Sequence, residues 1–287
     1  LAGAALESAI SELQSKPTWS EFDQIIDRAL AFKLDVIPQL VQGHTFPGNM
    51  IAQIAGHPIA PDGSKRGIGL AFPNGTEQVY YVDPGTYLYH LKVFAHAVAR
   101  RYRNKISIWM LESELNAAKF NYKFGWWRAG DCWADESLDG FQDKVWRVLV
   151  EAVRAEDPTA KIITALHMMN IVKGIERFGP DLDIVGVNCY PNLAFAAPVM
   201  GFAVGEMVWA TRRVLRALNM EDKPVYVTET NYPGVIESDT VDLPARTAID
   251  YNLKYFSHGR QRQFMQDAIE SAARNGAKGF LWWTFLG

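Results

Sequence analysis

Three glutamates close short apolar runs in this sequence. Glu112 and Glu114 follow the apolar run in the stretch KISIWMLESELN, residues 105–116. The apolar residues of this stretch are typical of a short buried strand. They are two positions apart, so their side chains leave an extended chain on the same side. Glu229 ends a second such run, KPVYVTET at residues 223–230. A buried strand has little reason to end in carboxylates unless that end opens on a site.

Two carboxylates at one rim of a parallel sheet are the groups that glycoside hydrolysis requires. One carboxylic acid protonates the leaving oxygen, and a second, ionised carboxylate attacks the sugar or activates water. In β/α barrels, such groups gather at the carboxyl ends of the strands. For one glutamate alone, a salt bridge at a strand rim is the simpler explanation. The pair favours a site that brings Glu114 and Glu229 together.

The elements around these glutamates alternate between helices and strands. Amphipathic patterns predict helices at residues 87–102, 141–153 and 263–274, among others. Two apolar runs around Pro73-Asn74-Gly75 predict a β-hairpin. Strand-like runs lie near Leu34, Ile106, Ile162, Ile184, Val225 and Phe280. Alternation of this kind indicates an α/β fold, a (β/α)8 TIM barrel. Only six strands are visible, so either the N-terminal segment adds irregular strands or the barrel is incomplete.

Composition places limits on the partners of the chain. Its 287 residues, of which 48% are hydrophobic, predict one domain over residues 1–287. The net charge of −3 gives no reason to expect nucleic acid or a membrane surface as partner. No apolar run approaches the roughly 18 residues of a membrane span, so we expect a soluble protein of undefined compartment. Cys132 and Cys189 fit either one disulfide or two free thiols.

Other chemistries find little support. The sequence has no glycine-rich phosphate loop and no G-x-S-x-G turn around a nucleophilic serine. His44, His167 and a carboxylate could in principle hold a metal, but no closely spaced histidine pair seeds such a site. The sequence therefore predicts an enzyme without a metal or other cofactor.

At the three glutamates the sequence resembles the clan A retaining glycoside hydrolases, the 4/7 superfamily of cellulase-like and β-glycosidase-like barrels. In that family the fourth strand ends in Asn-Glu, which WMLESELN matches at Glu114, with Ser113 in place of the asparagine. The seventh strand commonly ends in Thr-Glu, which VYVTETN matches at Glu229. The resemblance implies cleavage of β-glycosidic bonds by double displacement, with Glu114 as acid/base and Glu229 as nucleophile.

The resemblance also implies an oligosaccharide or polysaccharide substrate. The candidate binding residues follow predicted strands or belong to an aromatic segment at residues 120–133 that is predicted to be a loop: His44, Asn116, Trp126, Trp127, His167, Asn188, Tyr190 and Trp283. Glu229 needs a hydrogen-bond donor to stay ionised, and Tyr190 is the candidate. Because Ser113 is shorter than asparagine, the alternative is a carbohydrate-binding barrel with weak or lost catalysis.

Overall fold

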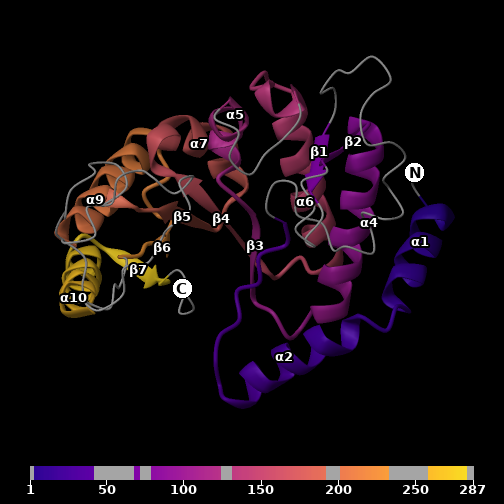
Figure 1. Ribbon diagram of the computed structural model, residues 1–287, viewed down its shortest axis with the longest axis horizontal. Coiled ribbons are helices and arrows are strands. Elements are labelled where there is room, and N and C mark those ends of the chain that lie inside the picture. The colour runs from indigo at the N-terminus through magenta and orange to yellow at the C-terminus, as the bar shows by residue number, and fades with distance from the viewer. Residues whose placement is uncertain are drawn as a thin grey trace. The chain divides into compact units, whose positions relative to one another are not determined.

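The computed structural model describes residues 3–41, 68–71, 79–123, 131–191, 201–232 and 258–282 (Figure 1). The chain divides into two compact units, residues 1–164 and 165–287, and the division falls inside strand β4. The described strands form an antiparallel pair, β1-β2, and a five-stranded sheet in the order β3-β4-β5-β6-β7. A single domain over the whole chain stays a prediction.

The first unit contains mainly helices, together with strands β1, β2 and β3 and the start of β4. Its elements are α1 (Ala4–Gln14), α2 (Trp19–Ala31), β1 (Ile68–Ala71), β2 (Val79–Val82), α4 (Pro84–Tyr102), β3 (Ile108–Ser113), η1 (Leu115–Ala117), α5 (Ala118–Lys123), η2 (Asp131–Ala134), α6 (Phe141–Glu156) and the start of β4 (Lys161–His167). The predicted hairpin is confirmed, because β1 and β2 pair antiparallel from Ile68↔Val82 to Ala71↔Val79. Its turn lies outside the described residues.

Two predictions for the first unit are wrong in part. The run at residues 34–41 forms one parallel bridge, between Gln39 and Met110, instead of a strand. Pro38 has no N–H to donate to a ladder, and only its carbonyl takes part, accepting from the Met110 N–H at 3.0 Å. The aromatic segment is not all loop, since Phe120 lies in α5 and Trp133, fully buried, lies in η2.

The second unit alternates strands and helices. Its elements are the end of β4, η3 (Met168–Asn170), α7 (Ile171–Phe178), η4 (Gly179–Asp181), β5 (Ile184–Asn188), α9 (Phe202–Ala217), β6 (Val225–Glu229), α10 (His258–Arg274) and β7 (Ala277–Phe280). Strand β6 pairs in parallel with both β5 and β7. Parallel strands joined through helices are the arrangement that the alternating sequence pattern predicts.

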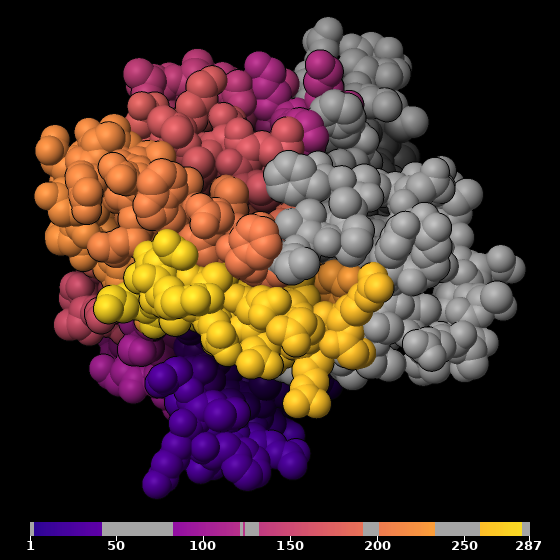
Figure 2. Space-filling model, turned by 90° about the vertical axis from the view of Figure 1, so that its left-hand side faces the viewer, coloured from indigo at the N-terminus to yellow at the C-terminus, as the bar shows by residue number. Residues whose placement is uncertain are grey.

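Helices α9 and α10 lie side by side at the surface of the second unit (Figure 2). Their close approach depends on Gly205, where a Cβ atom would lie 2.7 Å from the backbone carbonyl carbon of Ser271. The Ser271 hydroxyl also donates to the carbonyl of Gly201 at 3.2 Å. Position 205 therefore needs a glycine, because even one added methyl group would overpack the contact between the two helices.

Helix α4 is the centre of the first unit, where it packs against α6 and α1 (Figure 1). The Asp83 side chain caps its first turn by accepting from the Thr86 N–H at 3.0 Å, and Pro84 occupies the first helical position. Where α1 meets α4, the buried apolar residues are Leu6, Ile10, Val93 and Ala97. No described helix is both long and apolar enough to cross a membrane.

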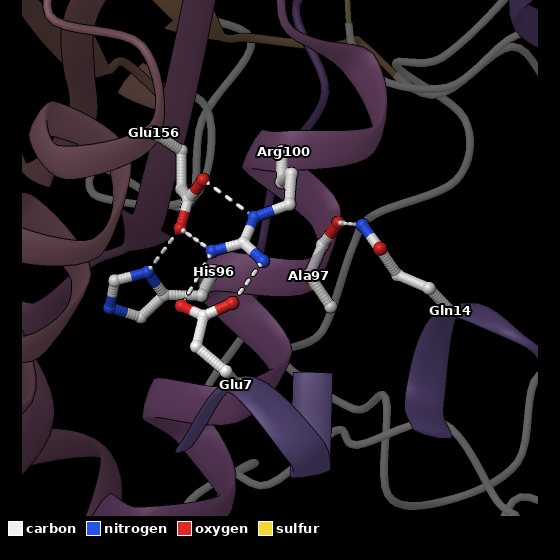
Figure 3. Close-up of polar contacts among 6 residues, drawn as sticks. All are labelled: Glu7, Gln14, His96, Ala97, Arg100 and Glu156. Carbon is white, nitrogen blue, oxygen red and sulfur yellow. Dashed lines mark hydrogen bonds and ion pairs between the residues drawn. The ribbon is translucent and has the colours of Figure 1, made fainter. Parts of the chain in front are cut away.

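An ion-pair network joins these three helices (Figure 3). The guanidinium of Arg100 donates to both carboxylate oxygens of Glu156 at 2.8 Å and to both of Glu7 at 2.7 and 3.0 Å. His96 Nδ1 lies 2.7 Å from Glu156 Oε1. Burial alone would raise the pKa of Glu156, but the hydrogen bonds from Arg100 and His96 outweigh it and hold this pKa below its ordinary value.

Arg100→Met should therefore destabilise the protein by about 2 kcal/mol at neutral pH, because Glu156 loses two charge-assisted hydrogen bonds. A carboxyl with a lowered pKa contributes stability above the ordinary carboxylate range and loses it as pH falls through the lowered value. The effect of the substitution should therefore shrink in acid. Urea unfolding at several pH values measures both expectations.

The matched control is Lys105→Met, which removes the exposed ion pair between Lys105 and Asp27. Exposed pairs contribute about 0–1 kcal/mol, so this variant should unfold close to the wild type. Equal destabilisation of the two variants would contradict a special role for the Arg100 network.

Candidate active site

In the first unit, β3 ends in a buried polar run. Glu112 and Ser113 are each 1% exposed and Glu114 is 4% exposed. The Thr164 hydroxyl on β4 donates to the carbonyl of Glu112 at 2.5 Å. Asn116, a predicted binding residue, is buried just beyond, in η1. Burying so many polar groups at a strand end is costly, so this end of β3 has the character of a site.

The backbone turns sharply at Glu114. This residue has φ 55° and ψ 34°, in the left-handed region, and its carbonyl accepts from the Ala117 N–H at 2.9 Å to start η1. A side chain disfavours this conformation by about 1–2 kcal/mol. Strain of this kind persists where the surrounding structure imposes it, often at functional sites.

The strain at Glu114 should be measurable as a difference in the free energy of unfolding between two variants. Both Glu114→Ala and Glu114→Gly remove the carboxyl group, but only glycine adopts the left-handed conformation freely. We expect the glycine variant to be more stable than the alanine variant by about 1 kcal/mol, measured by urea unfolding. At Glu151, exposed within α6, glycine should instead be the less stable of the two by a similar amount. The same order at both positions would mean that the turn at Glu114 carries no strain.

In the second unit, the ends of β5 and β6 bring three predicted site residues together: Asn188, Tyr190 and Glu229. The Tyr190 hydroxyl donates to Glu229 Oε2 at 2.8 Å, so the predicted donor to this carboxylate is present. The Cys189 N–H donates to the backbone carbonyl of Glu229 at 2.7 Å. Glu229 itself is only partly buried. Its carboxylate is thus held in place by Tyr190, on a residue that keeps part of its surface exposed.

The Asn188 side chain is held from the neighbouring strand. Thr228, the residue before Glu229, donates its hydroxyl to Asn188 Oδ1 at 2.9 Å, and both side chains are buried. The sequence pattern around Glu229 does not single out Thr228 as a site residue. The only sequence signal is its place in the Thr-Glu-Thr end of β6, since a hydroxyl in a buried strand needs a partner.

His167 ends β4, as predicted, and its ring is affected by burial and by a hydrogen bond from the backbone. Burial lowers the pKa of the imidazole, which favours the neutral ring. Its Nδ1 accepts from the Met169 N–H at 3.1 Å, so the proton of the neutral ring is placed on Nε2. The Nε2–H group is therefore the hydrogen-bond donor of this ring.

The remaining predicted site residues, His44, Trp126, Trp127 and Trp283, lie outside the described residues. Neither Cys132 nor Cys189 is part of a disulfide, and burial raises the pKa of Cys189 to about 12, so the Cys189 thiol is unreactive. Within the described part of the chain, no group of three His, Cys, Asp or Glu residues could hold a metal ion.

Several solved structures are similar to this chain. A β-D-glucuronidase of Dictyoglomus thermophilum has a TM-score of 0.56 and 15% identity, with coverage of 92% of this chain and 36% of that one. An uncultured Clostridium sp. β-glucuronidase has a TM-score of 0.54 and 13% identity, with coverage of 92% and 35%. The Ignisphaera aggregans GH53 catalytic domain has a TM-score of 0.52 and 14% identity, with coverage of 90% and 65%.

The chain spans about a third of the length of the two glucuronidases. No protein-family model matches it, and no curated protein matches it. At these identities the likeness shows the fold alone. The fold is α/β, with a parallel sheet whose structural neighbours are β/α-barrel glycoside hydrolases, as the sequence pattern predicts.

Proposed function

We propose that this chain contains the active site of a retaining β-glycoside hydrolase, with Glu229 as nucleophile and Glu114 as acid/base. The observation that carries the proposal is the Glu229 carboxylate, which ends a parallel strand and accepts from the Tyr190 hydroxyl at 2.8 Å. The fold is shared with β-glucuronidases and with a GH53 catalytic domain. Fold likeness raises the expectation of this activity, but one fold hosts many functions, so the activity is inferred from the residues of the site.

The two carboxyl groups lie in environments that suit different roles. Tyr190 donates to Glu229, and a hydrogen bond to the ionised form favours the carboxylate that a nucleophile needs. Glu114 is 4% exposed, and the acid/base role proposed for it needs the neutral acid, which can protonate a leaving group. Environments that favour opposite protonation states are the usual basis for assigning acid and nucleophile.

The proposed reaction has two displacements. Glu229 attacks the anomeric carbon and the glycosidic C–O bond breaks, while the proton of Glu114 moves to the leaving oxygen. Glu114, now ionised, then takes a proton from water, whose oxygen attacks the same carbon and releases Glu229. Each displacement inverts the anomeric carbon, so the released sugar keeps its configuration. Asn116, His167 and Asn188, with His44, Trp126, Trp127 and Trp283, are proposed to bind the oligosaccharide or polysaccharide.

A panel of aryl β-glycosides tests the proposal, and it should include the β-glucuronide, β-galactoside and β-glucoside. We expect hydrolysis of at least one, and proton NMR of the first sugar released should show the β-anomer. Release of the α-anomer would overturn the retaining mechanism. No hydrolysis of any glycoside, including oligosaccharides, would overturn the proposed activity.

The second candidate function is carbohydrate binding without efficient catalysis. Ser113 favours it, because this residue stands where the hydrolases that the sequence resembles carry a longer asparagine, and it is 1% exposed. Titration calorimetry with the same sugars separates the two functions. Binding without turnover would identify a binding protein.

A further inference from the structure

The pairing of β5 with β6 contains an irregularity at the candidate nucleophile. Val187 pairs with Val227, but the next residue of β5, Asn188, pairs with Glu229. Thr228 is therefore an extra residue on β6. Bulges are rare between parallel strands and are over-represented next to active sites, where they redirect a side chain.

The extra residue changes the face on which Glu229 lies. Side chains alternate along a strand, so in a regular β6 Glu229 would share the face of Val225 and Val227. Both valines are fully buried, whereas Glu229 is partly exposed and meets the Tyr190 hydroxyl. One inserted residue shifts the alternation by one position, which moves the carboxylate away from the valine face.

The bulge is held by cross-strand hydrogen bonds on both sides. The Thr228 hydroxyl donates to Asn188 Oδ1, and the Cys189 N–H donates to the carbonyl of Glu229. The Tyr190 hydroxyl adds a third contact, to the Glu229 carboxylate. Asn188, Cys189 and Tyr190, the three residues after Val187, therefore all bond to Thr228 or Glu229 of β6. Of these three contacts, only the one to Asn188 is made by the inserted residue, Thr228. The Thr228 side chain is 4% exposed.

We propose that Thr228 is a positioning residue for the nucleophile. Its hydroxyl locks the bulged backbone to Asn188, and this lock directs the Glu229 carboxylate to the Tyr190 hydroxyl. The role of Glu229 rests on the proposed function, whereas the lock itself does not. Thr228 acts through Glu229 and touches no substrate.

The test uses isosteric substitutions in the full chain. Thr228→Val keeps the shape and removes the donor, and Thr228→Ser keeps the donor. Thr211→Val is the matched control, because Thr211 is also buried in the second unit and donates its hydroxyl to the backbone carbonyl of Met207 in α9. Thr228→Ala is examined as well, so that failure of the valine variant to fold does not end the test.

We expect Thr228→Val to lower kcat by roughly 10- to 100-fold with KM nearly unchanged, because a small misplacement of a reacting group is costly. The acidic limb of its kcat/KM profile should move to higher pH, since a weaker hydrogen bond disfavours the ionised form of Glu229. Thr228→Ser and Thr211→Val should match the wild type within about threefold in kcat.

A second readout needs no activity. Carbon-13 NMR of the Glu229 carboxyl, assigned with Glu229→Gln, should show protonation at higher pH in Thr228→Val and Thr228→Ala than in Thr228→Ser or the wild type. Equal titration in all of them would overturn the proposal, as would equal loss of activity in the serine and valine variants. If the wild type hydrolyses no glycoside, the proposed function fails, while this titration still tests the lock.

Discussion

Glu229→Ala should abolish turnover of every aryl β-glycoside that the chain hydrolyses. Loss of the nucleophile removes the covalent intermediate, so both displacements fail, and kcat should fall on the order of 10⁴-fold or more. Initial rates with the best substrate of the panel measure the effect. The fold should survive, because Glu229 is partly exposed and ends its strand.

The control for this variant is Glu206→Ala, which removes an exposed carboxylate from α9 in the same unit. Its activity should equal that of the wild type. A Glu229→Ala protein that is folded and still active would exclude Glu229 as the nucleophile and, with it, the proposed mechanism.

Glu114→Ala should have an effect that depends on the leaving group. General acid catalysis contributes about 10²- to 10⁴-fold, so substrates with poor leaving groups should lose that much activity. Dinitrophenyl glycosides, which need little protonation, should form the glycosyl-enzyme at nearly the normal rate. Azide should then attack it without help from a general base, and the product should be a glycosyl azide of retained configuration.

Glu112→Ala, two residues away on β3, is the comparison that assigns the acid. If the leaving-group dependence and azide rescue appear only in Glu114→Ala, Glu114 is the acid/base. If they appear only in Glu112→Ala, Glu112 takes that role. Unchanged hydrolysis in both variants would mean that the acid lies elsewhere in the chain.

The sequence predicted the features that depend on local pattern. Apolar runs followed by polar residues located the ends of β3 and β6, and the turn residues located the β1-β2 hairpin. The hydrogen bond from Tyr190 to Glu229 followed from the chemistry that an ionised nucleophile requires. The roles of Glu114 and Glu229 remain predictions that the kinetic experiments test.

Other features could not be predicted, because they arise from pairing and packing. A period of two along β6 cannot reveal the inserted residue, since Thr228 is an extra residue only relative to β5. Nothing in the side chain of Glu114 signals a left-handed conformation, which the surrounding structure imposes. The run at residues 34–41 looked like a strand, and Pro38 was the overlooked residue that limits its pairing.

The Arg100 network also bears on the order in which the first unit folds. Its bonds join residues 93 positions apart, Glu7 and Arg100, and 56 positions apart, Arg100 and Glu156. Closing loops of this length costs entropy before any contact compensates for it. Arg100 can satisfy both carboxylates only after α1, α4 and α6 have assembled. The network therefore stabilises the finished three-helix packing and gives little help to the early steps that form it.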